Sequence, residues 1–159
     1  MPPLWFTLLK GARGPTGSPP PPMTTFHGAL ITRSTDQAIV TSDFVSFDTV
    51  VFDTDSFFDL AHPTRLTIPT TGKYAFGTNI EVADVTATVL ITVARNADGI
   101  TLLGAGDDAT RTFGQFAASG VLDFTAGDFI EVGVGTDLAA SITVTADGNL
   151  PQLWVFNYT

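Results

Sequence analysis

Apolar and polar residues alternate along most of the chain from residue 23 onward, and this period of two limits the possible folds more than any other feature. The alternation is clear over residues 64–68, 74–82, 86–95, 129–135 and 141–145. No stretch has apolar residues at i, i+3, i+4 and i+7 between helix caps. A strand with this alternation buries one face and turns the other to water. The pattern predicts an all-β chain of about ten short strands, packed as an antiparallel jelly-roll β-sandwich.

The composition supports one folded domain and excludes several kinds of site. The 159 residues are 44% hydrophobic and only 14% charged, which is too apolar for a disordered chain. Cysteine is absent, so disulfides, thiolate metal sites and cysteine nucleophiles are excluded. Acidic residues outnumber basic ones by 16 to 7, for a net charge of −9. Such a chain repels phosphate backbones, and we expect no nucleic-acid partner.

The first 22 residues differ from the rest and form a separate segment. Gly11, Gly14 and Gly17 fall at every third position, with proline and small residues between them and a run of prolines after them. This is the collagen pattern, but so few triplets also suit an extended Pro/Gly linker, and both interpretations stay open. We divide the chain into an extended arm, residues 1–22, and a jelly-roll domain, residues 23–159.

The arm combines basic residues with apolar side chains whose exposure to water is unfavourable. It carries Lys10 and Arg13 and no acid, whereas the rest of the chain is strongly acidic. A disordered terminus is one interpretation. We expect instead that the apolar residues of the arm anchor the protein to a larger assembly: Leu4, Trp5, Phe6, Leu8 and Leu9. The apolar run is too short to span a membrane and lacks the features of a secretory signal, so we expect synthesis in the cytoplasm and no membrane insertion.

Residues suited to catalysis or metal binding are few. His27 and His62 are isolated in the sequence, and we expect ordinary surface histidines and no enzymatic activity. Carboxylates cluster at residues 53–59 and again at Asp107 and Asp108. Asp107 and Asp108 are weak candidates for a calcium site, since calcium takes several carboxylate and carbonyl oxygens, but solvated loop acids are the simpler interpretation. We expect no cofactor.

Four motifs occur in an order that resembles a known family. Residues 72–76 read Gly-Lys-Tyr-Ala-Phe, residues 91–96 read Ile-Thr-Val-Ala-Arg-Asn, residues 126–128 read Ala-Gly-Asp, and residues 153–158 read Leu-Trp-Val-Phe-Asn-Tyr. In this order they resemble the globular heads of the complement first-component q subunit, which are related to tumour necrosis factor. Similar heads behind short collagen-like stems occur in phage fibre, minor tail and decoration proteins. The resemblance implies a jelly roll assembled as a tight homotrimer.

The last of these motifs places large aromatic residues on one face of an expected strand. Trp154, Phe156 and Tyr158 alternate with Leu153 and Val155, so both faces of this strand are apolar. One face belongs in the core of the domain, and the other needs a second partner, either another layer of the same sandwich or another subunit. We assign the trimer interface and core to large aromatic residues: Tyr74, Phe76, Trp154, Phe156 and Tyr158.

Together these features favour a structural role without enzymatic activity. We expect a trimeric knob on the surface of a virus particle, anchored by its arm to the capsid or tail of a bacteriophage as a decoration protein, head fibre or minor tail protein. A host-surface glycan or protein is a further expected partner. The alternative is a cellular collagen-like recognition module or a spore-surface module, which predicts a longer collagen stem or an export signal.

Overall fold

The computed structural model describes residues 26–85, 88–97, 100–105, 111–136, 141–146 and 151–158. In this part of the chain twelve β-strands form two antiparallel sheets, and none of it is helical. The all-β jelly-roll sandwich that the alternation predicted is therefore confirmed. Among these residues, no helix is long and apolar enough to cross a membrane.

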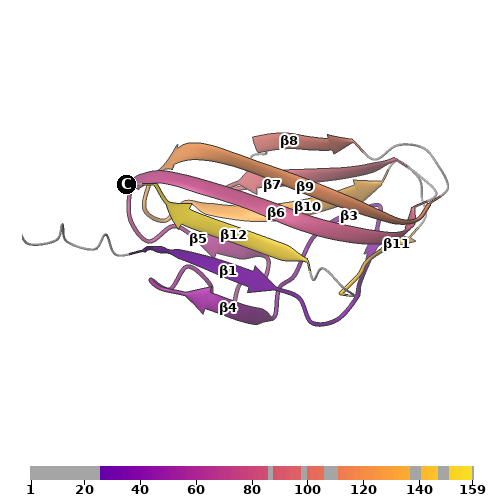
Figure 1. The fold of residues 1–159 in the computed structure, drawn as a ribbon, viewed down its shortest axis with the longest axis horizontal. Helices are drawn as coiled ribbons and strands as arrows, with labels where there is room; N and C mark the ends of the chain where they lie inside the picture. The colour runs from indigo at the N-terminus through magenta and orange to yellow at the C-terminus, as the bar shows by residue number, and fades with distance from the viewer. Residues whose placement is uncertain are drawn as a thin grey trace, which may run out of the picture.

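Seven strands form the first sheet. Their order is β2-β11-β6-β12-β1-β4, and β9 pairs with β6 along its other edge. Figure 1 shows β4, β1, β12, β6 and β9 side by side. The strands are β1 (Gly28–Thr32), β2 (Gln37–Val40), β4 (Thr49–Asp53), β6 (Gly72–Val85), β9 (Arg111–Phe124), β11 (Ser141–Val144) and β12 (Gln152–Asn157).

Five strands form the second sheet, which lies against the first. Their order is β3-β10-β7-β8. The first residues of β10 pair with β5, and its later residues pair with β3. The strands are β3 (Ser42–Phe44), β5 (Arg65–Thr67), β7 (Val89–Arg95), β8 (Ile100–Ala105) and β10 (Phe129–Thr136).

The core between the sheets consists of the inward residues of each alternating strand. Tyr74 and Phe76 of β6 are both buried, and their rings meet the ring of Phe124 edge to face at 6.1 and 5.7 Å between centroids. Each such side chain contributes about 1.5–3 kcal/mol by leaving water. The hydroxyl of Tyr74 donates to the carbonyl oxygen of Thr70 at 2.7 Å, so the buried phenol has a partner.

The turn between β9 and β10 explains the Ala-Gly-Asp motif. Gly127 has a φ of 92°, a backbone conformation that residues with a Cβ rarely adopt. The carboxylate of Asp128 then accepts hydrogen bonds from the backbone of Thr125 at 2.7 Å, from Asn96 at 2.6 Å and from Arg95 at 2.5 Å. The motif therefore ties the β9–β10 turn to the end of β7.

The structure has more strands than the ten or so that the alternation predicted. One reason lies at Thr41, whose φ of 68° breaks residues 37–44 into two short strands. β2 pairs with β11 in the first sheet, whereas β3 pairs with β10 in the second. These two consecutive segments belong to different sheets and so count as two strands in the fold.

Candidate functional site

A group of four aromatic side chains lies on the outer face of the seven-stranded sheet, away from the core. We call these residues, Phe26, Phe52, Trp154 and Phe156, the aromatic face. The rings of Trp154 and Phe156 stack with centroids 5.0 Å apart and planes 23° apart, and Phe52 stacks on Phe156 at 6.1 Å. Phe26 completes the group at 5.2 Å from Phe156 and 5.7 Å from Phe52, and 56% of its surface is exposed.

Two glycines in neighbouring strands let these rings lie close to the sheet. Gly77 of β6 is opposite Trp154, and Gly28 of β1 is opposite Phe156. A Cβ on Gly28 would stand 2.6 Å from the Phe156 ring, and a Cβ on Gly77 would overlap the Trp154 indole. Both glycines therefore mark a close approach of side chain to backbone, which is one use of glycine within strands.

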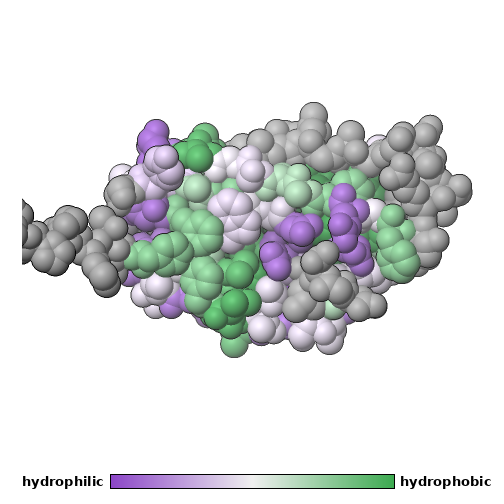
Figure 2. Space-filling model, in the orientation of Figure 1, coloured by the Kyte–Doolittle hydropathy of each residue, from purple (hydrophilic) through white to green (hydrophobic). Residues whose placement is uncertain are grey.

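The rest of this outer face is apolar near the aromatic rings and polar farther along. Val121 of β9 is opposite Ala75 and has 51% of its surface exposed. Lys73 and Asp123 form an exposed ion pair at 3.5 Å, and Glu81 accepts a hydrogen bond from Gln115 at 2.8 Å. Figure 2 shows the hydrophobic surface gathered over β1, β4 and β12, with hydrophilic residues beside it along the sheet.

β12 therefore has two apolar faces with different surroundings. Leu153 and Val155 are fully buried in the core, whereas Trp154 and Phe156 are only half-buried on the outside. Among the described residues, no second layer covers the outer face, so β12 is not a strand enclosed within one sandwich.

The structure divides the aromatic residues that we assigned to the trimer interface and core. Tyr74 and Phe76 belong to the core of the protomer, and Trp154 and Phe156 lie on the outer face. Tyr158 lies just beyond β12 and has 68% of its surface exposed. Its backbone N–H donates to the carbonyl oxygen of Lys73 at 2.7 Å.

Two residues of the aromatic face were missed by the sequence analysis. Phe26 and Phe52 reach Phe156 only because β1 lies between β4 and β12 in the sheet. No local pattern in the sequence reports that neighbourhood. The glycines opposite the rings were a usable signal, but only once the pairing of the strands was known.

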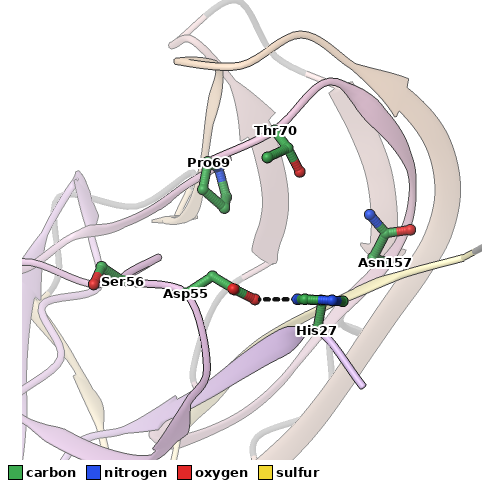
Figure 3. A pocket seen from close by; sticks show the side chains of 6 residues that line it. All are labelled: His27, Asp55, Ser56, Pro69, Thr70 and Asn157. Atoms are coloured by element: carbon green, nitrogen blue, oxygen red, sulfur yellow. Dashed lines mark hydrogen bonds and ion pairs between the residues drawn. The ribbon is translucent and has the colours of Figure 1, made fainter. Parts of the chain in front are cut away.

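A second candidate site is an open depression where β1 begins and where β4 and β12 end. Its lining residues are His27, Asp55, Ser56, Pro69, Thr70 and Asn157. Figure 3 shows Asp55 and His27 joined on one side, with Pro69, Thr70 and Asn157 on the other. His27 Nδ1 lies 2.6 Å from Asp55 Oδ2, so this surface histidine has an acidic partner 28 residues away in the sequence.

The electrostatics of this depression follow from that short contact. The hydrogen bond from His27 lowers the pKa of Asp55, and a second hydrogen bond from the hydroxyl of Thr54, at 2.8 Å, acts in the same direction. Asp55 is therefore ionised at neutral pH and accepts both hydrogen bonds. The hydroxyl of Thr70 bonds Tyr74 instead, so these contacts place no nucleophile on the histidine.

The neighbouring acids accept backbone hydrogen bonds that hold their loops in place. Asp53 accepts backbone hydrogen bonds from Phe57 and Phe58, both at 3.0 Å. Asp59 accepts one from Ala61 at 2.9 Å. Within the described ranges, no group of three or more histidines and carboxylates is placed to hold a metal ion.

Several predicted residues lie outside the described residues. These are the anchor residues Leu4, Trp5, Phe6, Leu8 and Leu9, the collagen-like glycines Gly11, Gly14 and Gly17, and the weak calcium candidates Asp107 and Asp108. Their assignments stay predictions.

Comparisons with known proteins agree with the fold. No family model matches the chain, and no curated protein matches its sequence. Among solved structures, murine APRIL aligns with a TM-score of 0.64 and 16% identity over 84% of this chain and 100% of its own. Eiger TNF from S. frugiperda aligns with a TM-score of 0.64 and 15% identity over 84% of this chain and 93% of its own.

The globular domain of zebrafish complement 1qA aligns with a TM-score of 0.56 and 15% identity, over 82% of this chain and 94% of its own. The fold is therefore the jelly roll of tumour necrosis factor and complement q proteins, as the sequence motifs implied.

Proposed function

We propose that this protein is a non-enzymatic structural knob that assembles as a homotrimer through the outer face of its seven-stranded sheet. The observation that carries the proposal is the pair of apolar faces on β12. One face is fully buried in the core, and the other carries Trp154 and Phe156 at the surface. Exposed apolar patches of this kind, bordered by polar residues, are typical of protein–protein interfaces.

The energetics favour covering this face. Aromatic side chains bury about 150–250 Å² each, and each Å² removed from water contributes about 25 cal/mol. Phe26 keeps 56% of its surface exposed and Val121 keeps 51%, so much of this area remains available to a partner. The rings are held in one arrangement by stacking on each other, which reduces the entropy lost when a partner binds.

A second copy of the chain is the partner that we propose. The sequence motifs resemble a family of homotrimeric jelly rolls, and the fold is the one that these motifs implied. The apolar patch lies between two polar regions, the Lys73–Asp123 ion pair and the Glu81–Gln115 hydrogen bond. A partner that buries the apolar patch leaves these charges near the rim, where burial costs least.

We further propose that the trimer belongs to the surface of a virus particle, on the capsid or tail of a bacteriophage. The arm supports this placement, because its first nine residues are apolar except for Thr7 and its collagen-like triplets suit a narrow stem of three chains. A basic arm ahead of an acidic domain also suits attachment to an acidic partner.

The test is a comparison of the full chain with a variant that lacks residues 1–10. Native mass spectrometry is expected to give a homotrimer for both proteins, because the aromatic face is intact in both. Only the full chain is expected in purified particles, where electron microscopy locates it on the capsid or tail. A monomer at micromolar concentration refutes the assembly. Equal incorporation of both proteins refutes the anchor, and a chain found on cells instead of particles favours the cellular recognition module.

A further inference from the structure

A shallow groove crosses the outer face of the five-stranded sheet, on the opposite side of the sandwich from the aromatic face. Gly133 and Gly135 of β10 form its floor, since alternate residues of a strand point to the same side. Its volume is about 290 Å³. That is near the lower end for small-molecule sites, so a ligand of one or two small rings fits it better than a larger one.

The walls of the groove come from the two strands that pair with β10. Phe44 is opposite Gly133 and Ser42 is opposite Gly135 on β3. Thr92 and Leu90 face the same two glycines from β7, and Leu90 has 41% of its surface exposed. One wall therefore offers an aromatic ring and the other an aliphatic side chain, and each wall carries a hydroxyl.

The two glycines have different roles. A Cβ on Gly133 would stand 2.6 Å from the Thr92 hydroxyl, so this glycine is needed for the packing of its neighbours. A Cβ on Gly135 would lie 3.6 Å from Ser42 Cβ, which is ordinary contact. The space above Gly135 is therefore open, and packing within the protomer does not require a glycine there. Glycine in the interior of a strand can also mark the close approach of a ligand.

The groups that remain free in this groove are polar side chains, not backbone. The N–H and C=O groups of β10 are engaged in the ladders with β3 and β7, so the floor offers no main-chain bonds to a peptide. Among the described residues, no hydrogen bond occupies the Ser42 hydroxyl. Asp43 is opposite Val134 instead of a floor glycine, and its Oδ1 accepts the backbone N–H of Phe44 at 2.8 Å. The Thr92 hydroxyl makes only a long contact, 3.5 Å, with the Gly133 carbonyl.

We propose that this groove binds one pyranose ring of a neutral glycan. The apolar C–H face of a pyranose fits against Phe44 and Leu90, and its hydroxyls can exchange hydrogen bonds with Ser42 and Thr92. An anionic ligand is disfavoured by Asp43 and by the net charge of −9. A purely apolar ligand would leave the polar rim unpaired. This proposal rests on the proposed function and deepens it. A trimer formed through the seven-stranded sheet leaves the five-stranded sheet exposed, and the glycan is the ligand proposed for that sheet.

The test uses saturation-transfer NMR with methyl glycosides of glucose, mannose, galactose and rhamnose and with N-acetylglucosamine, at millimolar concentration. The full chain is expected to transfer saturation to the ring protons of at least one of these sugars. Gly135→Val fills the floor and is expected to lower the affinity about tenfold or more. Ser141→Val is the matched control, because it introduces the same side chain at an exposed position of the other sheet and is expected to bind as the unchanged protein does.

Two further variants keep the inference falsifiable if Gly135→Val fails to fold. Phe44→Tyr retains the ring and is expected to bind, whereas Ser42→Ala removes one exposed hydroxyl and is expected to weaken binding. Absence of transfer with every sugar, or equal binding by the Gly135→Val and Ser141→Val variants, overturns the proposal. The oligomeric state of each sample is measured separately, so a monomer that still binds sugar refutes the trimer and leaves the groove assignment intact.

Discussion

Replacing Val121 by Asp tests the proposed interface with little effect on the protomer. Val121 lies on the outer face of β9, opposite Ala75, and 51% of its surface is exposed. In an isolated protomer the new carboxylate reaches water, so the fold keeps its core. In a trimer formed through this face, the same carboxylate is buried against an apolar surface. The substitution therefore separates assembly from folding.

The size of the effect follows from the cost of burying an unpaired charge. After relaxation that cost is about 3 kcal/mol for each carboxylate, and a trimer carries three of them, for about 9 kcal/mol per trimer. At about 1.4 kcal/mol per factor of ten, the association constant falls about a million-fold. Because the concentration at which half of the trimer dissociates varies as the inverse square root of that constant, this concentration rises about a thousand-fold.

The assay is sedimentation velocity or native mass spectrometry over a range of micromolar concentrations, with circular dichroism as a check on folding. Leu90→Asp is the matched control, since Leu90 is comparably exposed, at 41%, on the opposite sheet. We expect Val121→Asp to be a folded monomer and Leu90→Asp to be a trimer. If Val121→Asp assembles like the unchanged chain, the outer face of the seven-stranded sheet is not the interface and the reasoning fails.

Two further predictions concern the residues that shape this fold. Gly77→Val overlaps the Trp154 indole and is expected to destabilise the protein by about 1–3 kcal/mol. In a Trp5→Phe background Trp154 is the remaining tryptophan, and a shift of its fluorescence emission to longer wavelength would report the displaced ring. Unchanged emission would contradict this packing. Hydrogen bonds, that of Asn96 first, hold the pKa of Asp128 below its ordinary value of 3.8, so the stability it contributes is complete above that value and is lost as the pH falls through the lower folded pKa. As the pH falls through this range, the melting temperature is expected to drop less for Asp128→Asn than for the unchanged protein. An identical pH dependence of the two melting temperatures would count against a stabilising role of the Asp128 carboxylate.

Strand positions were predictable from the sequence because they depend on local alternation. Residues 129–135 and 153–158 alternate, and β10 and β12 cover almost the same residues. The Ala-Gly-Asp turn was predictable in part for a similar reason, since the φ of Gly127 and the hydrogen bond from Thr125 to Asp128 are local. The bonds of Asp128 to Arg95 and Asn96, at the end of another strand, were not. The two apolar faces of β12 also follow from a period of two.

The neighbours across strands were not predictable in this way. His27 and Asp55 are 28 residues apart in the sequence, and their contact exists because β1 and β4 pair. The break at Thr41, which sends β2 and β3 to different sheets, lies outside the segments where alternation predicted strands.

The alternation of the chain therefore determined which residues face inward and which face outward, because side-chain direction in a strand depends only on position along it. Only the tertiary structure decided which outward residues meet. The order of strands brings Phe26, Phe52, Trp154 and Phe156 into one surface, and the same order sets Gly28 and Gly77 opposite two of their rings. Strand order and register depend on the packing of the whole core, which no single segment of the sequence encodes.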